Sequence, residues 1–432
     1  NKGLGQGDCD GSQETPCGNL NDIFPIMANG DTIRMIAGDY GPGYMLNGNN
    51  NQWGNNLTEL TIIGNTGNPD DVRINGNNNE QIFGLNNMKV TLRNVSFLNG
   101  DASGGNGGAI AAHYGELSID NCIFENNHSQ AEWGTGGAIH TYMTSVSINN
   151  SIFKHNKSKT SGGALQISTG DSQAPEDYKV FVNITHTQFI NNRVTGDDQS
   201  GGVRGGAISV EPSLGFEMKV LHSIFDNNII FCQADGSGGE GSAIWIQPQS
   251  PDSWDGVKPI ILGQNIFKNN VIEVNNNNSW MDATVRTGWS THIINSLFLS
   301  NRLQSNGDQG GGNSAVSFSF NDSQGSEPDN LFVNNTVIGN TTTLSTGPTY
   351  SSAVSFWNSY AVVFNNIIWD NGGENGGVNF QDTKNVKANA HNNIDNHWGQ
   401  DSDLGPGSMS VQPKFKNRSN NNFQLSNASQ LI

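Results

Sequence analysis

Residues 136–156 read GGAIHTYMTSVSINNSIFKHN, and this stretch decides the fold. Val146, Ile148 and Asn150 recur at every second position, which is the period of a β-strand with one buried face. Phe153 breaks that period by one residue, so the chain must bend between Asn150 and Phe153. A strand, a bend and a corner of paired glycine within one short stretch predict one coil of a solenoid.

The same unit recurs along most of the chain. Its apolar anchors are Phe97, Phe124, Phe153, Phe189, Phe225, Phe267, Phe298, Val337 and Ile368. Three positions before each anchor lies a column of amides and histidines, namely Asn94, Asn121, Asn150, His186, His222, Gln264, Asn295, Asn334 and Asn365. Stacked coils would place these polar side chains about 4.8 Å apart. We therefore interpret the column as an internal structural ladder beside the apolar core.

Two tetrapeptides repeat around the anchors. One is Gly-Gly-Ala followed by Ile, Leu or Val, as at 136–139, and the other is Phe-x-x-Asn, as at 153–156. These GGA(I/L/V) and FxxN motifs resemble the repeats of the chlamydial polymorphic outer-membrane proteins, over roughly residues 97 to 371. The flanking segments resemble the wider pectate-lyase-like class. Both resemblances imply a right-handed parallel β-helix.

We predict an all-β chain with one right-handed parallel β-helix of about 11–12 coils over residues 29–432. Its repeats are clear from 90 to 371 and irregular from 372 to 432. Residues 1–28 should form a short N-terminal cap, in which Cys9 and Cys17 have the spacing of a local disulfide. Cys122 and Cys232 fall in different registers of the repeat, so we expect both thiols to be reduced and packed.

The net charge and the short apolar runs argue against two classes of partner, nucleic acids and membranes. The net charge of -18 would repel a nucleic acid, and no apolar run is long enough to span a membrane. The last coil shows no polar cap, so we expect further chain or another copy to cover its sheet edge. End-to-end self-association of a secreted, cell-surface protein follows as a hypothesis.

Asn-x-Ser/Thr sequons suggest a glycoprotein. Asn149 and Asn183 alternate with the inward Ile148 and Ile184 and should point outward. The other candidates lie in polar loops or terminal coils: Asn56, Asn277, Asn321, Asn417 and Asn427. The sequons in the two repeating columns are expected to be buried and unmodified: Asn94, Asn127, Asn156, Asn334 and Asn340.

Catalytic residues are harder to identify in this sequence. Asp197 and Asp198 could mimic the carboxylate pair of a glycosidase, although a solvated turn explains them better. The Lys and Arg residues do not stack as a lyase base would, and Trp254 in an insertion at 247–258 could serve as a sugar platform or only decorate a loop. No metal-ligand spacing occurs, so no cofactor is predicted, and calcium at a surface carboxylate stays open.

These observations favour an extracellular structural or adhesive surface protein without catalytic activity, which could be the subunit of a glycosylated fibre. The alternatives are a carbohydrate-active β-helix enzyme, either a lyase or a glycoside hydrolase, and a glycan-binding module without turnover. A β-helix alone does not decide among them.

Overall fold

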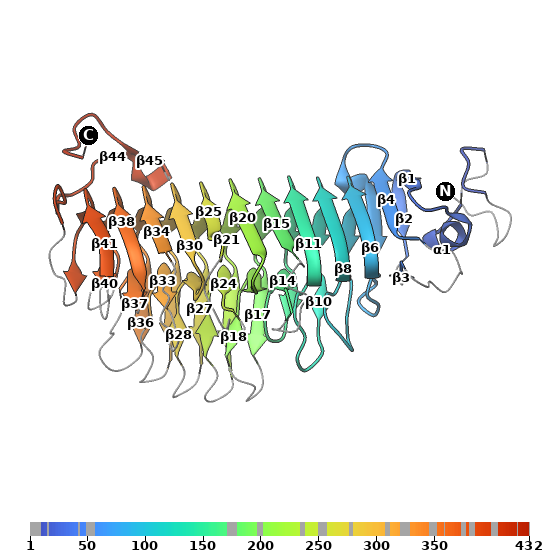
Figure 1. Cartoon of the computed structure of the whole chain (residues 1–432), viewed down its shortest axis with the longest axis horizontal. Helices are drawn as coiled ribbons and strands as arrows, with labels where there is room; N and C mark the ends of the chain where they lie inside the picture. The colour runs from blue at the N-terminus through green and yellow to red at the C-terminus, as the bar shows by residue number, and fades with distance from the viewer. Residues whose placement is uncertain are drawn as a thin grey trace.

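The computed structural model is an elongated parallel β-helix, in which the chain advances coil by coil from an N-terminal cap to a C-terminal hairpin (Figure 1). The structure describes residues 10–14, 17–41, 44–48, 57–170, 179–196, 202–233, 238–248, 257–275, 280–306, 312–319, 329–344, 352–357, 359–372, 377–379, 385–398, 405–420 and 422–431. One sheet holds 12 parallel strands, one for each coil. The predicted all-β parallel β-helix and its number of coils are confirmed.

Sheet A is the widest surface, and many coils contribute two segments to it. Its strands are β1 (Thr32–Met35), β3 (Tyr44–Asn47), β4 (Glu59–Gly64), β6 (Phe83–Arg93), β8 (Ile110–Asp120), β11 (Ile139–Asn149), β14 (Leu165–Ser168), β15 (Val180–Thr185), β19 (Ile208–Glu211), β20 (Phe216–Leu221), β24 (Ile244–Ile246), β25 (Ile260–Gly263), β29 (Val285–Thr287), β30 (Thr291–Ile294), β33 (Val316–Ser319), β34 (Asp329–Val333), β37 (Val354–Trp357), β38 (Tyr360–Phe364), β40 (Val378–Asn379), β41 (Asn385–Ala390) and β43 (His397–Trp398). In β20 the side chains of Phe216, Met218 and Val220 are buried. This alternation builds one wall of the core.

Sheet B follows sheet A in each coil and consists of very short strands. They are β2 (Gly38–Tyr40), β5 (Val72–Asn75), β7 (Ser96–Leu98), β9 (Ile123–Glu125), β12 (Ile152–Lys154), β16 (Gln188–Ile190), β21 (Ile224–Asp226), β26 (Ile266–Lys268), β31 (Leu297–Leu299), β35 (Thr336–Ile338), β39 (Ile367–Trp369) and β42 (Asn393–Ile394). From β7 to β39 the strands are short because a left-handed residue stands on each side. Asn121 has a φ of 49° and Asn126 a φ of 54°, on either side of β9. Asn tolerates this backbone region better than most residues.

The column predicted to be an internal ladder forms the first of these bends, and its predicted position inside the core is wrong. Asn94 and Asn121 are half-buried, and the remaining members are exposed: Asn150, His186, His222, Gln264, Asn295, Asn334 and Asn365. The left-handed residue ends the strand pleat, so the inward face stops at the residue two positions earlier. The column still stacks in register. The rings of His186 and His222 lie 5.0 Å apart, and Asn365 Nδ2 donates to Asn334 Oδ1 at 2.7 Å.

The buried ladder is instead the Asn of the FxxN motif. Its first seven rungs are completely buried: Asn127, Asn156, Asn192, Asn228, Asn270, Asn301 and Asn340. At Asn228, Oδ1 accepts hydrogen bonds from the backbone N–H and from Nδ2 of Asn192, at 3.1 and 3.0 Å. Its Nδ2 donates to the carbonyl of Phe189 and to Oδ1 of Asn270, both at 2.9 Å. Every donor and acceptor of the buried amide is therefore satisfied.

The anchor column forms a continuous aromatic stack inside the solenoid. Phe97, Phe124, Phe153, Phe189, Phe225, Phe267 and Phe298 stack with ring centroids 4.7–5.1 Å apart and planes within 5–14° of parallel. The anchors are fully buried, which confirms that this column is the core. The centroid spacing also gives the axial repeat of the coils, close to that of neighbouring β-strands.

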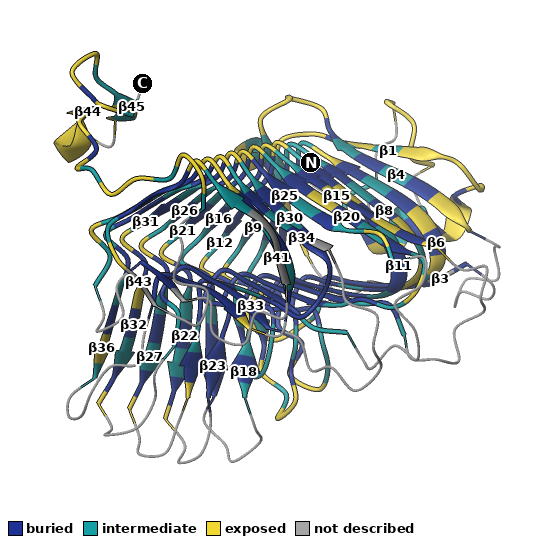
Figure 2. Cartoon of the chain, turned by 60° about the vertical axis from the view of Figure 1, so that its left-hand side comes forward, coloured by how far each residue is buried: buried dark blue, intermediate teal, exposed yellow. Residues whose placement is uncertain are grey.

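A wing of two further sheets projects from one corner of the solenoid (Figure 2). Sheet C contains β10 (His128–Ser129), β13 (Lys157–Ser158), β17 (Arg193–Gly196), β22 (Ile229–Cys232), β27 (Val271–Val274), β32 (Arg302–Ser305) and β36 (Thr341–Leu344). Sheet D contains β18 (Val203–Arg204), β23 (Gly239–Glu240) and β28 (Met281–Asp282). Val194, Ile230, Ile272 and Met281 belong to a second apolar cluster, separate from the main core.

The paired glycines make the corner between the wing and sheet A. Gly136, the first of its pair, has a φ of 64°. A Cβ on Gly137, the second, would overlap the carbonyl oxygen of Gly163 in the next coil. The corner agrees with the one predicted from the GGA motif, but the sequence analysis predicted neither the second cluster nor a wing.

The two ends differ. At the N-terminus, α1 (Leu20–Ile23) and η1 (Phe24–Ile26) bury Leu20 and Phe24 against the first coils. Cys17 is disulfide-bonded, and Cys9 lies outside the described residues, so the Cys9–Cys17 pair stays a prediction. At the other end, β44 (Phe415–Asn417) and β45 (Asn422–Leu425) form an antiparallel hairpin. Two 3-10 turns, η2 (Pro69–Asp71) and η3 (Arg418–Asn420), complete the described elements.

The thiols of Cys122 and Cys232 are both buried and reduced. Burial raises the pKa of the Cys122 thiol to about 12. That thiol is therefore protonated and unreactive at neutral pH, as a packed core cysteine should be. Within the described ranges, no helix has the length and apolar character needed to cross a bilayer.

We predict that Asn228→Ala will lower the unfolding free energy by about 3 kcal/mol or more, because it strips partners from buried groups of Asn192, Asn270 and Phe189. Urea unfolding followed by circular dichroism measures the change. Asn183→Ala is the matched control, because Asn183 is exposed in β15. Equal unfolding midpoints for the two variants would contradict a stabilising ladder.

The bend column predicts opposite effects for two substitutions at Gln264, which is exposed with a φ of 55°. Gln264→Gly should leave thermal stability unchanged or slightly higher, whereas the β-branched Gln264→Val should cost about 1–2 kcal/mol of left-handed strain. Thermal melts of both proteins test this. A tolerated Val would show that the bend is not left-handed at this position.

Candidate functional site

The glycine corner brings two polar columns together along the inside of the angle between sheet D and sheet A. At two of these corners the residue before the first glycine bonds the residue five positions later in the chain. Ser161 Oγ donates to Gln166 Oε1 at 2.8 Å, and Trp245 Nε1 donates to Glu240 Oε2 at the same distance. The corner is therefore a polar seam that runs parallel to the solenoid axis.

A compact charged cluster occupies the middle of this seam. Glu240 is 8% exposed, and its Oε1 lies 3.1 Å from Arg286 Nε, as an ion pair without hydrogen-bond alignment. Asp282 approaches the same nitrogen to 3.9 Å, and Arg286 also donates to Gln247 Oε1. The Arg204 guanidinium lies over the ring of Trp245, 4.7 Å from its centroid.

The cluster is electrically balanced. Two guanidinium groups, of Arg204 and Arg286, face the carboxyl groups of Glu240 and Asp282. Burial raises the pKa of the Glu240 carboxyl, while the Arg286 guanidinium draws it down. Both carboxylates are committed to partners within the chain, so the arrangement suits a fixed electrostatic clamp between wing and solenoid. The cluster is not evident in the sequence because its four residues belong to four different strands.

A second group of unusual side chains lies in β8 and β11 of sheet A. The rings of His113 and His140 meet edge to face at 5.7 Å, and Tyr142 packs against Tyr114 at 5.6 Å. His140 is 8% exposed, and its Nδ1 has no hydrogen-bond partner. Tyr114 and Met143 hold φ angles of 55° and 50°, a strained conformation for such large side chains.

Burial lowers the pKa of His140 to about 3, and the nearby His113 adds to this shift. Burial also lowers the pKa of His113 itself. Both imidazoles are therefore neutral near pH 7 and could offer one donor and one acceptor each to a polar group. The aromatic character of the group would suit a sugar ring, but Nδ1 of His140 is enclosed, which limits access to it.

We predict an acid instability that depends on His140. Between its ordinary pKa of 6.5 and about 3, the unfolded chain binds a proton that the folded chain excludes. Stability must then fall as the pH drops, by up to about 1.4 kcal/mol for each pH unit. Urea midpoints from pH 7 to pH 4 should fall more steeply in the wild type than in His140→Leu. The exposed His222→Asn variant is the control, and a wild-type slope in His140→Leu would refute this assignment.

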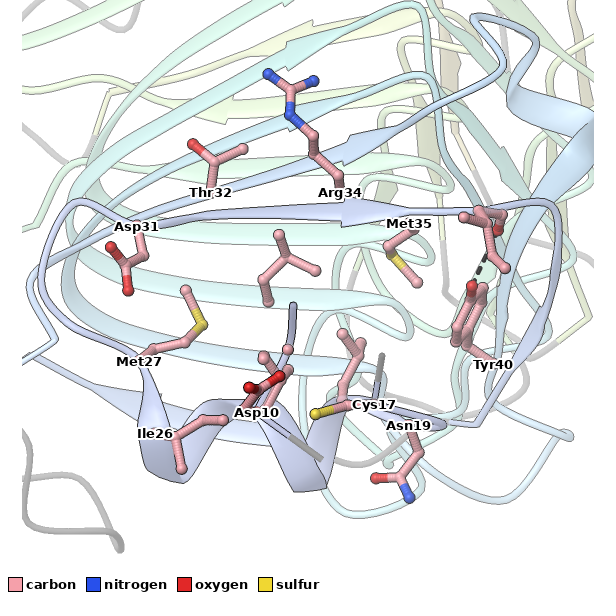
Figure 3. Close-up of a pocket in the computed structure, with 15 residues that line it drawn as sticks. Asp10, Cys17, Asn19, Ile26, Met27, Asp31, Thr32, Arg34, Met35 and Tyr40 are labelled. Atoms are coloured by element: carbon pink, nitrogen blue, oxygen red, sulfur yellow. Dashed lines mark hydrogen bonds between the residues drawn. The ribbon is translucent and has the colours of Figure 1, made fainter. Parts of the chain in front are cut away.

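A cavity of about 280 Å³ lies between the N-terminal cap and the first coil (Figure 3). Asp10, Cys17 and Met27 of the cap line one side, and Arg34 and Met35 of β1 line the other. Tyr40 closes one end, with its hydroxyl donating to the carbonyl of Ile36 at 2.9 Å. Because one wall belongs to the cap and the other to the first coil, we interpret this cavity as a gap in the packing between them.

The proposed catalytic and sugar-platform residues of the sequence analysis, Asp197, Asp198 and Trp254, lie outside the described residues. No group of His, Cys, Asp or Glu side chains in the part of the chain that the structure describes could hold a metal ion.

The sequons divide by exposure. Asn183, Asn417 and Asn427 are exposed, whereas Asn149 is half-buried and its Nδ2 donates to Asp120 Oδ1 at 2.9 Å. Asn56, Asn277 and Asn321 lie outside the described residues.

The sequons expected to be buried fall into two groups. Asn127, Asn156 and Asn340 are fully buried, as expected. Asn334 was also expected to be buried, but it is exposed because it occupies a left-handed bend. Asn94, at the same kind of bend, is half-buried.

No protein-family model matches the sequence, and no curated protein matches it. Among solved structures, the chain is similar to the A-module of the Azotobacter vinelandii mannuronan C-5 epimerase AlgE6. The alignment covers 89% of this chain and 92% of that one, with 13% identity and a TM-score of 0.30. No residue role passes from the epimerase to this chain on such a likeness.

Proposed function

We propose that this chain is an extracellular structural or adhesive surface protein without catalytic activity, built from repeats of the type found in chlamydial polymorphic outer-membrane proteins. The observation that carries the proposal is the uninterrupted internal packing. An aromatic stack and a fully bonded amide ladder run through successive coils, which makes a stiff rod with its long faces free for contact.

The polar seam supports a structural role rather than turnover. Its two carboxyl groups, of Glu240 and Asp282, already face the Arg286 guanidinium, and Glu240 also accepts the indole N–H of Trp245. A general acid or nucleophile must instead be directed toward a substrate. The net charge of -18 also suits a soluble, self-repelling outer surface.

The test is to display the full chain on inert beads and to measure attachment to cells or extracellular material from its natural source. Electron microscopy of the purified native protein gives the second readout, since end-to-end contacts would produce filaments. Beads that attach no better than beads carrying an unrelated acidic protein, together with isolated rods in the microscope, would contradict the proposal. Release of unsaturated uronate products would favour the enzyme alternative instead.

If the protein is secreted through a glycosylating pathway, we expect Asn183 to carry a glycan more fully than Asn149. A glycan is attached through Nδ2, which is engaged with Asp120 at Asn149 but exposed at Asn183. Peptide mass spectrometry of native protein, before and after deglycosylation, measures both occupancies. Full occupancy of the buried ladder residues Asn127 or Asn156 would contradict the described packing.

A further inference from the structure

We infer that the outward face of sheet B, with the bend columns on its two sides, binds an extended neutral polysaccharide. This surface is called the B face here. It deepens the proposed function by naming the class of partner that an adhesive rod would hold.

The B face presents polar side chains at a regular spacing in nearly every coil. Its first bend column is the exposed amide and histidine column described above. Its second bend column contains Asn99, Asn126, His155, Asn191, Asn227, Asn269, Ser300, Gly339 and Asp370. Both columns repeat with the coils, whose stacked rings are 4.7–5.1 Å apart. A sugar in an extended β-linked chain advances by a comparable length.

The chemistry of the columns suits hydroxyl groups. Asn121 Nδ2 donates to Asn94 Oδ1 at 2.9 Å, and Asn365 repeats this contact with Asn334. At Asn121 both N–H donors are used, because Nδ2 also donates to the carbonyl of Gly67 at 2.9 Å, whereas at Asn365 the contact with Asn334 uses one N–H donor and leaves the second for an outside partner. The remaining capacity faces outward at the exposed members and can bond the hydroxyls of a sugar.

Between the two columns lie aliphatic side chains that could pack against sugar rings, interrupted by Gln188 of β16 and Thr336 of β35. The half-buried Ile152, Ile224, Ile266, Leu297 and Ile367 occupy the first position of their sheet B strands. Charges at the third position cancel locally. Lys154 Nζ lies 3.0 Å from Glu125 Oε2, and Lys268 Nζ lies 3.0 Å from Asp226 Oδ2.

This charge balance selects a neutral partner. The whole chain carries a net charge of -18, so an anionic polymer such as a polyuronate would be repelled at long range. A neutral polymer meets no such penalty on a face whose ion pairs are already satisfied.

The C-terminal hairpin turns one end of the B face into a groove. A cavity of about 460 Å³ is lined by the bend residues Asn334, Asn365 and His391, by Ile367 of β39, and by Leu425 and Leu431 of the C-terminal segment. The ion pair between Arg418 and Asp370 holds the hairpin beside the last coils.

An exposed aromatic side chain stands beside this groove. Phe364 is 38% exposed and packs edge to face on His391, with ring centroids 5.2 Å apart. Such a ring, next to the amides of the bend column, is a typical element of a sugar-binding surface.

The test uses the full chain and its depletion from solution by insoluble cellulose, by chitin and by insoluble polygalacturonate. The variant Asn334→Gly/Asn365→Gly/His391→Gly removes the polar side chains of the groove. Glycine keeps the left-handed bends, whose φ angles are 58°, 55° and 55°, so the fold should survive. The control is Asn183→Ala/Lys219→Ala, two exposed positions on sheet A.

We expect the wild type and the control to bind a neutral polymer equally and the triple variant to bind about tenfold or more weakly, as three lost hydrogen bonds imply. Binding to none of the neutral polymers, stronger binding to polygalacturonate, or unchanged binding of the triple variant would each overturn the inference. The inference would also be overturned if sedimentation showed oligomers of the wild type and of the control but not of the triple variant, since the B face would then join two copies of the chain. If the triple variant still attaches to cells, only this inference is contradicted. If the wild type does not attach to cells, the proposed function is contradicted.

Discussion

The buried amide ladder is the interaction on which the rest of this structure depends. Each coil turns sharply where sheet B gives way to the wing, and backbone groups at that turn need partners that a flat sheet cannot supply. The Asn of each FxxN motif provides them, bonding the preceding coil through Phe carbonyls and the next through its own amide, as at Asn192 and Asn228. The ladder thereby sets the register in which the aromatic rings stack.

The paired glycines impose the second constraint. At Gly137 the backbone of the next coil approaches so closely that no side chain fits, and this approach turns the chain from the wing into sheet A. The corner separates two apolar clusters, one inside the solenoid and one between sheets C and D. Polar side chains gather along the boundary, and the buried pair of Glu240 and Arg286 fastens the two parts where they meet.

The same geometry explains why this solenoid offers surfaces more readily than a catalytic centre. The inward side chains are already engaged in the amide ladder and the aromatic stack, so a binding or catalytic site can only be formed on the outside by outward side chains. There the left-handed bends place amides and histidines at a fixed axial spacing, in positions where Asn is also a favoured residue for purely conformational reasons. One residue type therefore serves both the backbone of the bend and a repeating polar surface that a regular polymer could recognise.

The sequence by itself determined the parallel β-helix, the number of coils, the anchor stack and the burial of Asn127 and Asn156, because these depend on a repeat in which like residues must stack on like. The sequence indicated that both Asn-rich columns are buried, and only the tertiary structure decided that the column of Asn150 faces outward. In the sequence, Asn150 and Asn156 are the same residue type in two equally regular columns. A left-handed φ at Asn150 turns its side chain outward, and the pattern of residue types does not reveal that angle. The wing, the cluster around Glu240 and the hairpin beside Asp370 likewise join residues from separate coils, whose contacts exist only once the corners have brought them together.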